Sequence, residues 1–590
     1  MRMPTPDFYL PNDAGHHPPV APPTHHRVLT SAITLFRRLT MTNLQVVASV
    51  IRTNAVSNTI FTTALVAILV IAMSAMGISS VANANTFRWS SQGDITNHDP
   101  HSTGVAFTNQ FNGQIYEQLI GRDRNLKLIP RLATTWKQTN ANTWVFTMRE
   151  GVKFHDGAPL LVEDIVYSIE RAAMPTSTAK NVAMRLGRAR KIDNKTFELV
   201  TPTPNPMLLN QLGGGEIFIM NRAWCEKHGV LKPRDMVNKE ETFAARHANG
   251  TGPFMLGLRE PDTKTTLKKN PNWWGSASGL FTGNVAHVEY RPIKNAATRM
   301  AALISGEIDM VLDVPVQDVE RLRNEKKIKL YEGVENRIIF VGFDQARDEL
   351  LYSNVKVKNP FKDKRVRMAM YQAVDVDAIK TTVMRGLSTP TAMMTHAPME
   401  GLPASLEKRH PLDIAKAKEL LTQAGYPNGF EVTMDCPNNR YVNDEKMCIA
   451  LAGMWAKIGV TVKVNAMPMA LFFPKGTKLD TSLYLLGIGY ADTDAIHTLD
   501  GLRTRTATRG ISNWGNYNLP ALEALISSAE SDLDPQRRLK SITAALQMQH
   551  DEVLHIPLHR QVIPWASAKN VTVVHRPDNW LEVAWVTVGK

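Results

Sequence analysis

The sequence predicts a mixed α/β protein of two or three domains behind an export leader, and three observations support this class. Residues 135–157 alternate in side-chain character about an Asn-Ala-Asn turn, as an antiparallel hairpin does. Residues 430–464 show a strand, a helix and a second strand in succession, which is a βαβ-type unit. The chain has 590 residues, more than one hydrophobic core usually serves.

The N-terminal segment has the parts of a secretory signal peptide. Arg52 provides a basic flank, the run Ala64–Met76 is almost entirely apolar, and the triplet 82–84 offers an A-x-A cleavage site. The run is shorter than the about 20 apolar residues that a bilayer-spanning helix needs. We therefore predict that residues 1–84 are a leader and that the mature protein begins at residue 85.

Two alternatives remain open for this segment. The apolar run could extend through residues 77–84 and act as an uncleaved membrane anchor. Residues 4–26 are rich in Pro and His and show no apolar periodicity, whereas Met41 begins a leader of ordinary length. Met41 is therefore a possible true start of translation.

In the first half of the mature chain, side-chain periodicity predicts a strand at 86–89, the hairpin at 135–157, a helix at 161–172 and a strand at 194–201. The helix carries two acidic residues in its first turn, where they suit the positive end of the helix dipole. Three consecutive glycines at 213–215 lack the Gly-Lys-Ser/Thr of a phosphate loop, so they indicate a flexible or closely approached loop.

The second half alternates helices and strands. Helices are expected at 296–306, where Gly306 ends the pattern, over most of 360–379, at 413–424 and over most of 520–552. Strands are expected at 308–311, 336–344 and 483–489, in addition to the two strands of the βαβ unit. The class is α/β with antiparallel additions.

Composition excludes several kinds of partner and cofactor. The formal net charge is +13, but the basic residues are scattered among acidic and apolar ones, so no nucleic-acid-binding stripe is present. The sequence has three cysteines, of which Cys436 and Cys448 could pair in an oxidising compartment while Cys225 is left over. Because no CxxC motif or nearby histidine completes a metal site, we predict neither a bound metal nor another cofactor.

Three candidate catalytic motifs do not have the spacing or the residues that their chemistry requires. His550 and His555 resemble a zinc-protease pair, but they are five positions apart rather than four and would not share a helix face. Asp492 and Asp494 could be paired carboxylates, yet at i and i+2 they need not face one ligand. No Gly-x-Ser-x-Gly nucleophile elbow is present. We therefore predict that the protein is not an enzyme, and a secreted peptidase is kept as a remote alternative.

Over the whole mature length the chain resembles the solute-binding proteins of peptide-type ABC transporters, which include dipeptide-, oligopeptide- and nickel-binding proteins, and it looks most similar to the dipeptide-binding branch. The motifs that carry this resemblance are Trp144-Val145-Phe146-Thr147-Met148-Arg149-Glu150-Gly151-Val152-Lys153-Phe154-His155-Asp156-Gly157, Glu163-Asp164 with Ser168, Gly250-Thr251-Gly252-Pro253-Phe254, Asn270-Pro271 with Trp273-Trp274, Gly306-Glu307-Ile308-Asp309, and Arg365-Val366-Arg367 with Ala369.

The resemblance implies a periplasmic-binding-protein fold of type II, in which two lobes joined by a hinge close over a ligand and an extra α/β domain is inserted in the first lobe. It places lobe I at 85–116, 268–343 and 561–590, the inserted domain at 117–267, and lobe II at 344–560. The chain would cross to lobe II near Phe340–Asp344 and return near Ile556–Trp565.

The resemblance also implies a function: capture of short peptides, most specifically dipeptides, in the periplasm and delivery to an ABC permease in the inner membrane. No cysteine suited to lipid attachment follows the apolar run, which favours a protein without a lipid anchor in a Gram-negative periplasm. We also expect a monomer. The alternative is the same fold binding a non-peptide solute such as nickel, haem, an opine or a sugar-like molecule.

Three ligand-binding residues follow from matching this sequence to the family. Asp492 matches the acid that binds the peptide ammonium, and Arg440 lies where the dipeptide branch keeps the arginine for the peptide carboxylate, although the local register departs by about two residues. Tyr490 stands where many dipeptide binders have a tryptophan, and a tyrosine can still stack and hydrogen-bond. A disulfide between Cys436 and Cys448 would brace the Arg440 loop.

Overall fold

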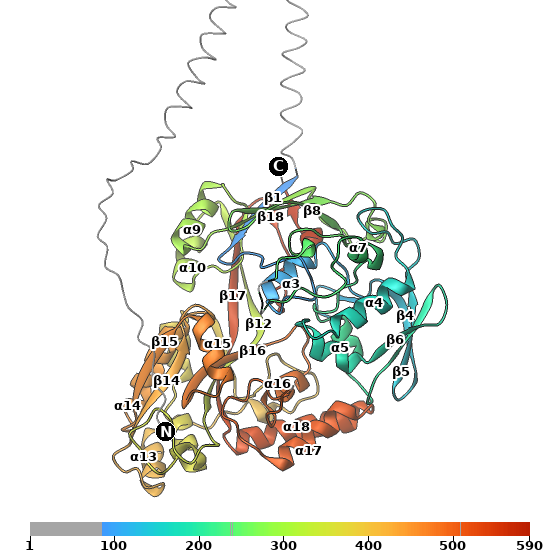
Figure 1. The fold of residues 1–590 in the computed structure, drawn as a ribbon. Coiled ribbons are helices and arrows are strands. Elements are labelled where there is room, and N and C mark those ends of the chain that lie inside the picture. The colour runs from blue at the N-terminus through green and yellow to red at the C-terminus, as the bar shows by residue number, and fades with distance from the viewer. Residues whose placement is uncertain (1–84, 237, 239, 508, 590) are drawn as a thin grey trace, which may run out of the picture. The chain divides into compact units, whose positions relative to one another are not determined.

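The computed structural model describes residues 85–236, 238, 240–507 and 509–589 (Figure 1). The predicted leader 1–84, with its signal peptide and the possible start at Met41, lies outside the described residues. Among the residues described, no helix combines the length and the apolar character needed to cross a membrane.

The elements of the first half alternate short helices with strands. The strands are β1 (Thr86–Ser91), β2 (Ile120–Arg122), β3 (Leu128–Pro130), β4 (Ala133–Asn140), β5 (Thr143–Met148), β6 (Arg188–Lys191), β7 (Thr196–Val200), β8 (Phe254–Glu260), β9 (Lys264–Lys269) and β10 (His287–Pro292). The helices are α3 (Ala106–Asn112), α4 (Val162–Ala172), α5 (Lys180–Leu186), α6 (Leu208–Leu212), α7 (Arg222–Lys227), α8 (Phe243–Arg246) and the 3-10 helix η1 (Trp274–Ser276).

The second half contains the longest strands and helices. The strands are β11 (Met310–Val311), β12 (Ile328–Phe343), β13 (Ser388–Pro390), β14 (Glu431–Pro437), β15 (Thr461–Met467), β16 (Leu483–Gly489), β17 (His555–Ala568), β18 (Val571–Thr572) and β19 (Thr587–Val588). The helices are α9 (Ala296–Ser305), α10 (Val316–Arg323), η2 (Pro360–Lys362), α11 (Lys364–Gln372), α12 (Val376–Ala378), the π-helix η3 (Ile379–Val383), η4 (Ala404–Glu407), α13 (Ile414–Gln423), α14 (Asp444–Ala456), α15 (Met469–Thr477), α16 (Ile496–Leu502), α17 (Pro520–Ser531), α18 (Pro535–Asp551) and η5 (Val583–Trp585).

One large mixed sheet runs through the described chain. Its strand order is β15-β14-β16-β12-β17-β11-β1-β10-β9-β8, with β13 added beside β17. At one end of the sheet, β15, β14 and β16 come from predicted lobe II. At the other end, β1, β10, β9 and β8 come from residues before 311, so the two ends belong to different parts of the sequence. The βαβ unit is confirmed, because β14 and β15 pair in parallel and α14 connects them.

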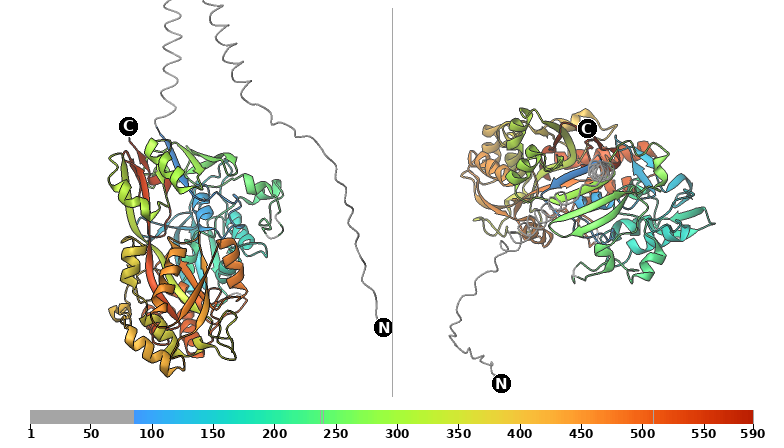
Figure 2. Two further views of the ribbon diagram at one scale, coloured as in Figure 1. Left: turned by 90° about the vertical axis from the view of Figure 1, so that its left-hand side faces the viewer. Right: turned by 90° about the horizontal axis from the view of Figure 1, so that it is seen from above.

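The strands β12 and β17 join the two ends of this sheet. They pair antiparallel along nearly their whole length, with register irregularities between Val334 and Ile338 and between Ile339 and Phe340 (Figure 1). In the left view of Figure 2, β17 is drawn in red and runs from one group of elements to the other. The sequence pattern predicted only the apolar second half of β12, because its first half, from Ile328 to Gly333, alternates charged and apolar residues at partly exposed positions.

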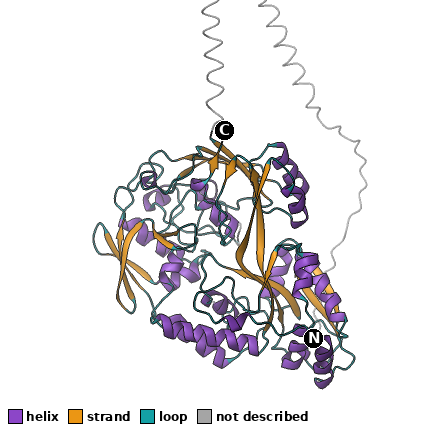
Figure 3. Ribbon diagram, turned by 180° about the vertical axis from the view of Figure 1, so that it is seen from behind, coloured by secondary structure: helices purple, strands orange, loops and turns teal. Residues whose placement is uncertain are grey.

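A second, four-stranded sheet forms within residues 133–200, in the order β4-β5-β7-β6 (Figure 3). The hairpin prediction is confirmed here, since β4 and β5 pair antiparallel on either side of Ala141 and Asn142. Helix α4 contacts β6, and its apolar side chains join those of the sheet in one core that includes Phe146, Phe197 and Ile165. This segment therefore buries its own hydrophobic core.

Two further cores lie at the ends of the large sheet. One surrounds the buried residues Trp89, Tyr290 and Trp565, and the other packs helices α11, α13 and α14 against β14 and β16 around Trp455. Helix ends follow the expected chemistry: Gly306 closes α9 with a positive φ of 79°, which an L side chain rarely adopts.

Candidate functional site

Asp492 lies in the loop that follows β16, at the carboxyl end of that strand. Its residue surface is only 6% exposed. The loop is fixed by two side chains that donate hydrogen bonds to the Asp492 carbonyl: Asn336 Nδ2 at 3.0 Å, from β12, and His396 Nε2 at 2.8 Å. Because Asn336 belongs to a strand that spans both ends of the sheet, the position of Asp492 is tied to the junction between them.

Three cationic or titratable side chains face the Asp492 carboxylate. His497 Nε2, from α16, is 3.1 Å from Oδ2, Arg122 Nη2 is 3.8 Å from the same oxygen, and His396 Nε2 is 3.8 Å from Oδ1. The backbone N–H of Asp494 also donates to Oδ1 at 2.9 Å. The carboxylate is thus buried in a positively charged environment.

These neighbours decide the ionisation of the cluster. Burial by itself raises the pKa of the Asp492 carboxyl, but His497, His396 and Arg122 outweigh it and hold that pKa well below its ordinary value. Burial lowers the pKa of the His497 ring, and the Asp492 charge reverses this and raises it above the usual value. Burial lowers the pKa of His396 to about 4, so that ring is neutral at ordinary pH. Asp492 is therefore an ionised carboxylate.

The Tyr490 ring contacts both imidazoles. Its ring centroid is 5.3 Å from that of His396, in an edge-on arrangement, and 4.8 Å from that of His497. Burial raises the pKa of the Tyr490 hydroxyl, so the group stays neutral. The structure brings Asp492 and Tyr490 together, but sequence reasoning missed both histidines. His396 is 96 positions away and only the tertiary fold places it there, whereas His497 is five positions along the chain and its nearness to Asp492 was a local signal.

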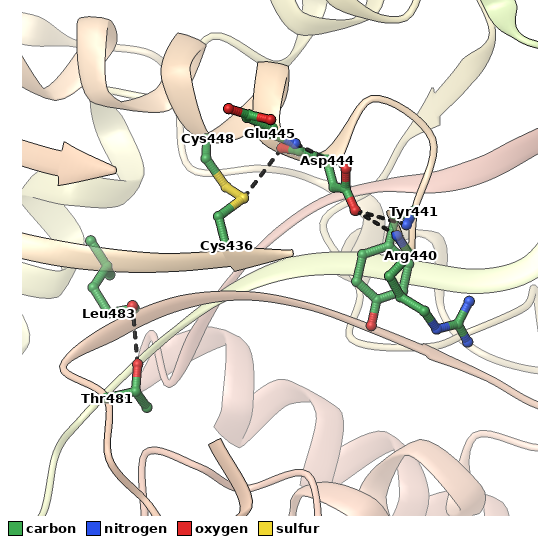
Figure 4. The surroundings of a disulfide bond; sticks show 8 residues. All are labelled: Cys436, Arg440, Tyr441, Asp444, Glu445, Cys448, Thr481 and Leu483. Atoms are coloured by element: carbon green, nitrogen blue, oxygen red, sulfur yellow. Dashed lines mark hydrogen bonds between the residues drawn. A yellow bond between two sulfur atoms is a disulfide. The ribbon is translucent and has the colours of Figure 1, made fainter. Parts of the chain in front are cut away.

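Arg440 lies in the loop after β14, the strand that pairs with β16 in parallel. Asp444 Oδ2 accepts hydrogen bonds from the backbone N–H groups of Arg440, at 2.9 Å, and Tyr441, at 3.0 Å, which shapes the loop. The guanidinium lies 5.1 Å from the Tyr441 ring centroid, and Figure 4 shows it pointing away from the disulfide. Within the described chain no carboxylate comes within 4.0 Å of it, so Arg440 offers an unpaired positive charge.

Burial lowers the pKa of Arg440, and the neighbouring Arg337 lowers it further. Arg337 itself is paired with Glu335 at 3.0 Å, and Glu335 accepts a hydrogen bond from Gln561 of β17. Gln561 in turn accepts from the Val442 N–H at 3.0 Å, which ties the Arg440 loop to the long strand. Asp492 and Arg440 therefore follow the carboxyl ends of two adjacent parallel strands, although no direct contact joins them.

A cavity lies beside this cluster, with about 630 Å³ of unfilled space that is partly open to solvent. Ala491, next to Asp492, lines it from one part of the sequence, and Arg122, Arg131, Trp273 and Trp580 line it from the other. The glycines 213–215 form part of its wall, and a Cβ added to Gly215 would lie 2.5 Å from the Trp580 ring. The glycine run is thus a closely approached loop rather than a phosphate loop.

Arg131 is a second buried cation at this cavity. Its side chain is 12% exposed and its nearest carboxylate is Glu117, at 3.9 Å. Glu117 also accepts a hydrogen bond from Trp274 Nε1 at 2.9 Å, and burial raises the pKa of its carboxyl. Because a pair at 3.9 Å makes no hydrogen bond, Arg131 retains donors for an acidic group in the cavity.

Cys436 and Cys448 form a disulfide between the end of β14 and the first turns of α14 (Figure 4). The bond closes the loop that carries Arg440. Cys225 is buried without a disulfide partner. Over the described ranges no group of three or more His, Cys, Asp or Glu side chains is arranged to hold a metal ion. His396 and His497 both face the Asp492 carboxylate.

A family model described as "Bacterial extracellular solute-binding proteins, family 5 Middle" matches residues 127–509 of this chain. The glutathione-binding protein GsiB of Escherichia coli O157:H7 is 25% identical over 488 residues, which cover 81% of this chain and 90% of that protein.

Two solved structures share the fold. The periplasmic binding protein DppA of Helicobacter pylori in complex with the peptide STSA matches with a TM-score of 0.71 and 21% identity, covering 86% of this chain and 98% of that one. NikZ of Campylobacter jejuni in complex with Ni(L-His) matches with a TM-score of 0.69 and 18% identity, covering 85% and 98%. The predicted fold class is confirmed by these matches, and the named relatives are binding proteins rather than enzymes.

Proposed function

The chain belongs to the bacterial extracellular solute-binding proteins of family 5, and from this premise we propose that it captures short peptides, dipeptides foremost, in the periplasm and delivers them to an ABC permease in the inner membrane. The observation that carries the proposal is the placement of an ionised carboxylate, Asp492, and an unpaired guanidinium, Arg440, after adjacent parallel strands. A free peptide carries opposite charges at its two ends, and charge-assisted hydrogen bonds to them are strong inside a closed cleft.

The long strands support the mechanical part of this proposal. We propose that the lobes, at the limits predicted above, rotate about β12 and β17 near the irregular register between Val334 and Ile338. Contacts already bridge the two parts in this structure: Arg185 of α5 pairs with Asp500 of α16 at 2.9 Å, and Arg122 faces Asp492. A permease can distinguish such a closed form from an open one, because closure changes the surface that it meets.

An acidic peptide is the second candidate ligand. Arg131 leaves donors free toward the cavity and Arg122 lies near Asp492, so the cavity offers two guanidinium groups to an acidic ligand. A glutathione-like tripeptide carries two carboxylates and one ammonium and would use the additional cation. The name of the relative GsiB agrees with this chemistry.

Calorimetry on the exported protein, unfolded and refolded to remove carried ligand, tests these proposals. The panel is a dipeptide, the same dipeptide N-acetylated, glutathione and Ni²⁺. Tight binding of the dipeptide that acetylation abolishes supports the peptide function, because acetylation removes only the ammonium charge. Tighter binding of glutathione than of the dipeptide selects the acidic peptide. If no peptide binds, the proposed function is wrong and a non-peptide solute takes its place.

A further inference from the structure

The Asp492 carboxylate is already compensated before any ligand arrives. Arg122 is held rigidly near it, because its guanidinium donates to the carbonyls of Leu126 at 3.0 Å, Gly213 at 3.1 Å and Asn210 at 3.3 Å. These bonds fix the Arg122 charge at 3.8 Å from Asp492 Oδ2. His497 is closer, at 3.1 Å from the same oxygen, and its charge depends on pH.

The groups around His497 leave it as the variable charge of the cluster. Asp494 is occupied by Arg538 at 2.7 Å, and Asp500 by Arg185 at 2.9 Å. The remaining groups that face the ring from the packed elements are Arg185 of α5, Glu216 after α6, His396, and the neutral Tyr490. His396 is neutral above about pH 4, so above that pH His497 is the imidazole that carries a variable charge beside Asp492.

We propose that His497 determines specificity by competing with the ligand ammonium for Asp492: the protonated ring neutralises the carboxylate, and an ammonium ligand binds with release of the His497 proton. This inference rests on the proposed function, because it requires a ligand that presents an ammonium group to Asp492. The proton leaves the imidazole for solvent, and the ligand ammonium takes its place as the counter-charge.

The sign of the effect follows from linkage. Asp492 raises the pKa of His497 above its usual value, so the ring in the free protein stays protonated to a higher pH than an ordinary histidine. Below that pKa, each unit of decreasing pH weakens binding by up to tenfold, since one proton must be released. Above that pKa, binding no longer depends on this proton. A ligand without an ammonium group gains nothing from the release.

His396 provides a matched control. Its ring faces the same carboxylate at 3.8 Å and is fully buried, whereas the His497 side chain is 17% exposed, and His396 donates to a carbonyl oxygen and titrates near pH 4. The variants are His497→Gln and His396→Gln. The first removes the titrating competitor, and the second removes a neutral structural contact of similar size.

The first experiment measures binding of Ala-Ala to the refolded exported protein by calorimetry between pH 5.5 and 7.5, in two buffers of different ionisation enthalpy. The upper limit keeps the peptide amine charged, because α-amino groups titrate at about 7.7–8.0. We expect affinity to fall at least tenfold toward pH 5.5, with release of up to one proton on binding. His497→Gln abolishes both effects, and His396→Gln retains them.

A second measurement does not need a ligand. The imidazole of His497 is titrated by NMR in the wild-type protein and in Asp492→Asn, where its pKa should fall because its counter-charge is gone. An unchanged His497 titration overturns the inference whatever the ligand is. Binding of Ala-Ala that is tight but independent of pH overturns it while leaving the peptide function intact, and absence of binding at every pH refutes both.

Discussion

The substitution Asp492→Asn isolates the charge on which the peptide proposal depends. Asparagine keeps the size of the side chain and an oxygen that can accept the Asp494 N–H, which donates to Asp492 Oδ1 at 2.9 Å. It removes the negative charge from a side chain that is 8% exposed. The local packing against Tyr490 and His396 should therefore persist while the ammonium loses its counter-charge.

The magnitude can be bounded from the surroundings of the carboxylate. Removing one partner of a buried, hydrogen-bonded charge pair costs about 2–5 kcal/mol of binding free energy. Here His497 and Arg122 share the Asp492 charge, so the ligand ammonium gains less than it would from an isolated carboxylate. We expect the lower part of the range, about 2–3 kcal/mol, which is roughly a 30- to 150-fold increase in Kd.

Calorimetric titration of the wild type and the variant with a dipeptide and with its N-acetylated form measures this loss. The dipeptide should bind Asp492→Asn more weakly by the stated factor, and the acetylated form should bind both proteins equally weakly. Asp494→Asn is the matched control: that carboxylate is paired with Arg538, and its loss should change Kd less than about twofold. Full dipeptide affinity in Asp492→Asn, with an unchanged thermal unfolding midpoint, would refute the assignment of Asp492.

Three further substitutions test the rest of the site. Arg440→Ala should weaken a dipeptide by about 1.5–3 kcal/mol, the value of a hydrogen bond to a charged group, and should leave its C-terminal amide unaffected; equal losses for both ligands by calorimetry would remove Arg440 from the site. Replacing Cys436 and Cys448 together by serine should lower the free energy of unfolding by about 3 kcal/mol, because the disulfide closes a loop with a sequence separation of 12; urea unfolding measures it, and an unchanged midpoint would contradict it. Gly215→Ala should displace Trp580 and cost about 1–2 kcal/mol of stability, since φ at Gly215 is +87° and the new Cβ would meet the ring; tryptophan fluorescence and thermal unfolding report the two effects, with Gly453→Ala, which meets no neighbour, as the control.

Local sequence patterns predicted the elements that form from local interactions. The strand at 483–489 and the helix that Gly306 ends agree with β16 and α9 to within a residue, because periodicity and capping are encoded in neighbouring positions. The first half of β12 was missed for a physical reason. Its exposed Lys329 and Glu332 resemble a surface loop, and only the pairing with β17 makes the segment a strand.

The candidate site divides in the same way. Asp492 and Tyr490 lie two positions apart, and a short motif can point to both. The partners that set their chemistry, Arg122 and His396, come from segments 370 and 96 residues away and have no pattern of their own in the sequence. Their roles depend on burial and distance, which the sequence does not state. A motif can therefore point to Asp492, but not to the distant guanidinium and imidazole that face its carboxylate.

The placement of the charges also explains why closure and binding should be coupled. Arg122 and Asp492 belong to different predicted parts, the inserted domain and lobe II, and we propose that Arg122 reaches its position near the carboxylate when these parts approach. The ammonium of a ligand would enter the same space. The carboxylate of the same ligand would supply negative charge to one further cation of the cleft. A zwitterionic ligand therefore keeps the closed cleft neutral, whereas a simple amine would leave it with an excess of buried positive charge. This difference favours peptides over amines for a reason that concerns the whole cleft and not Asp492 alone.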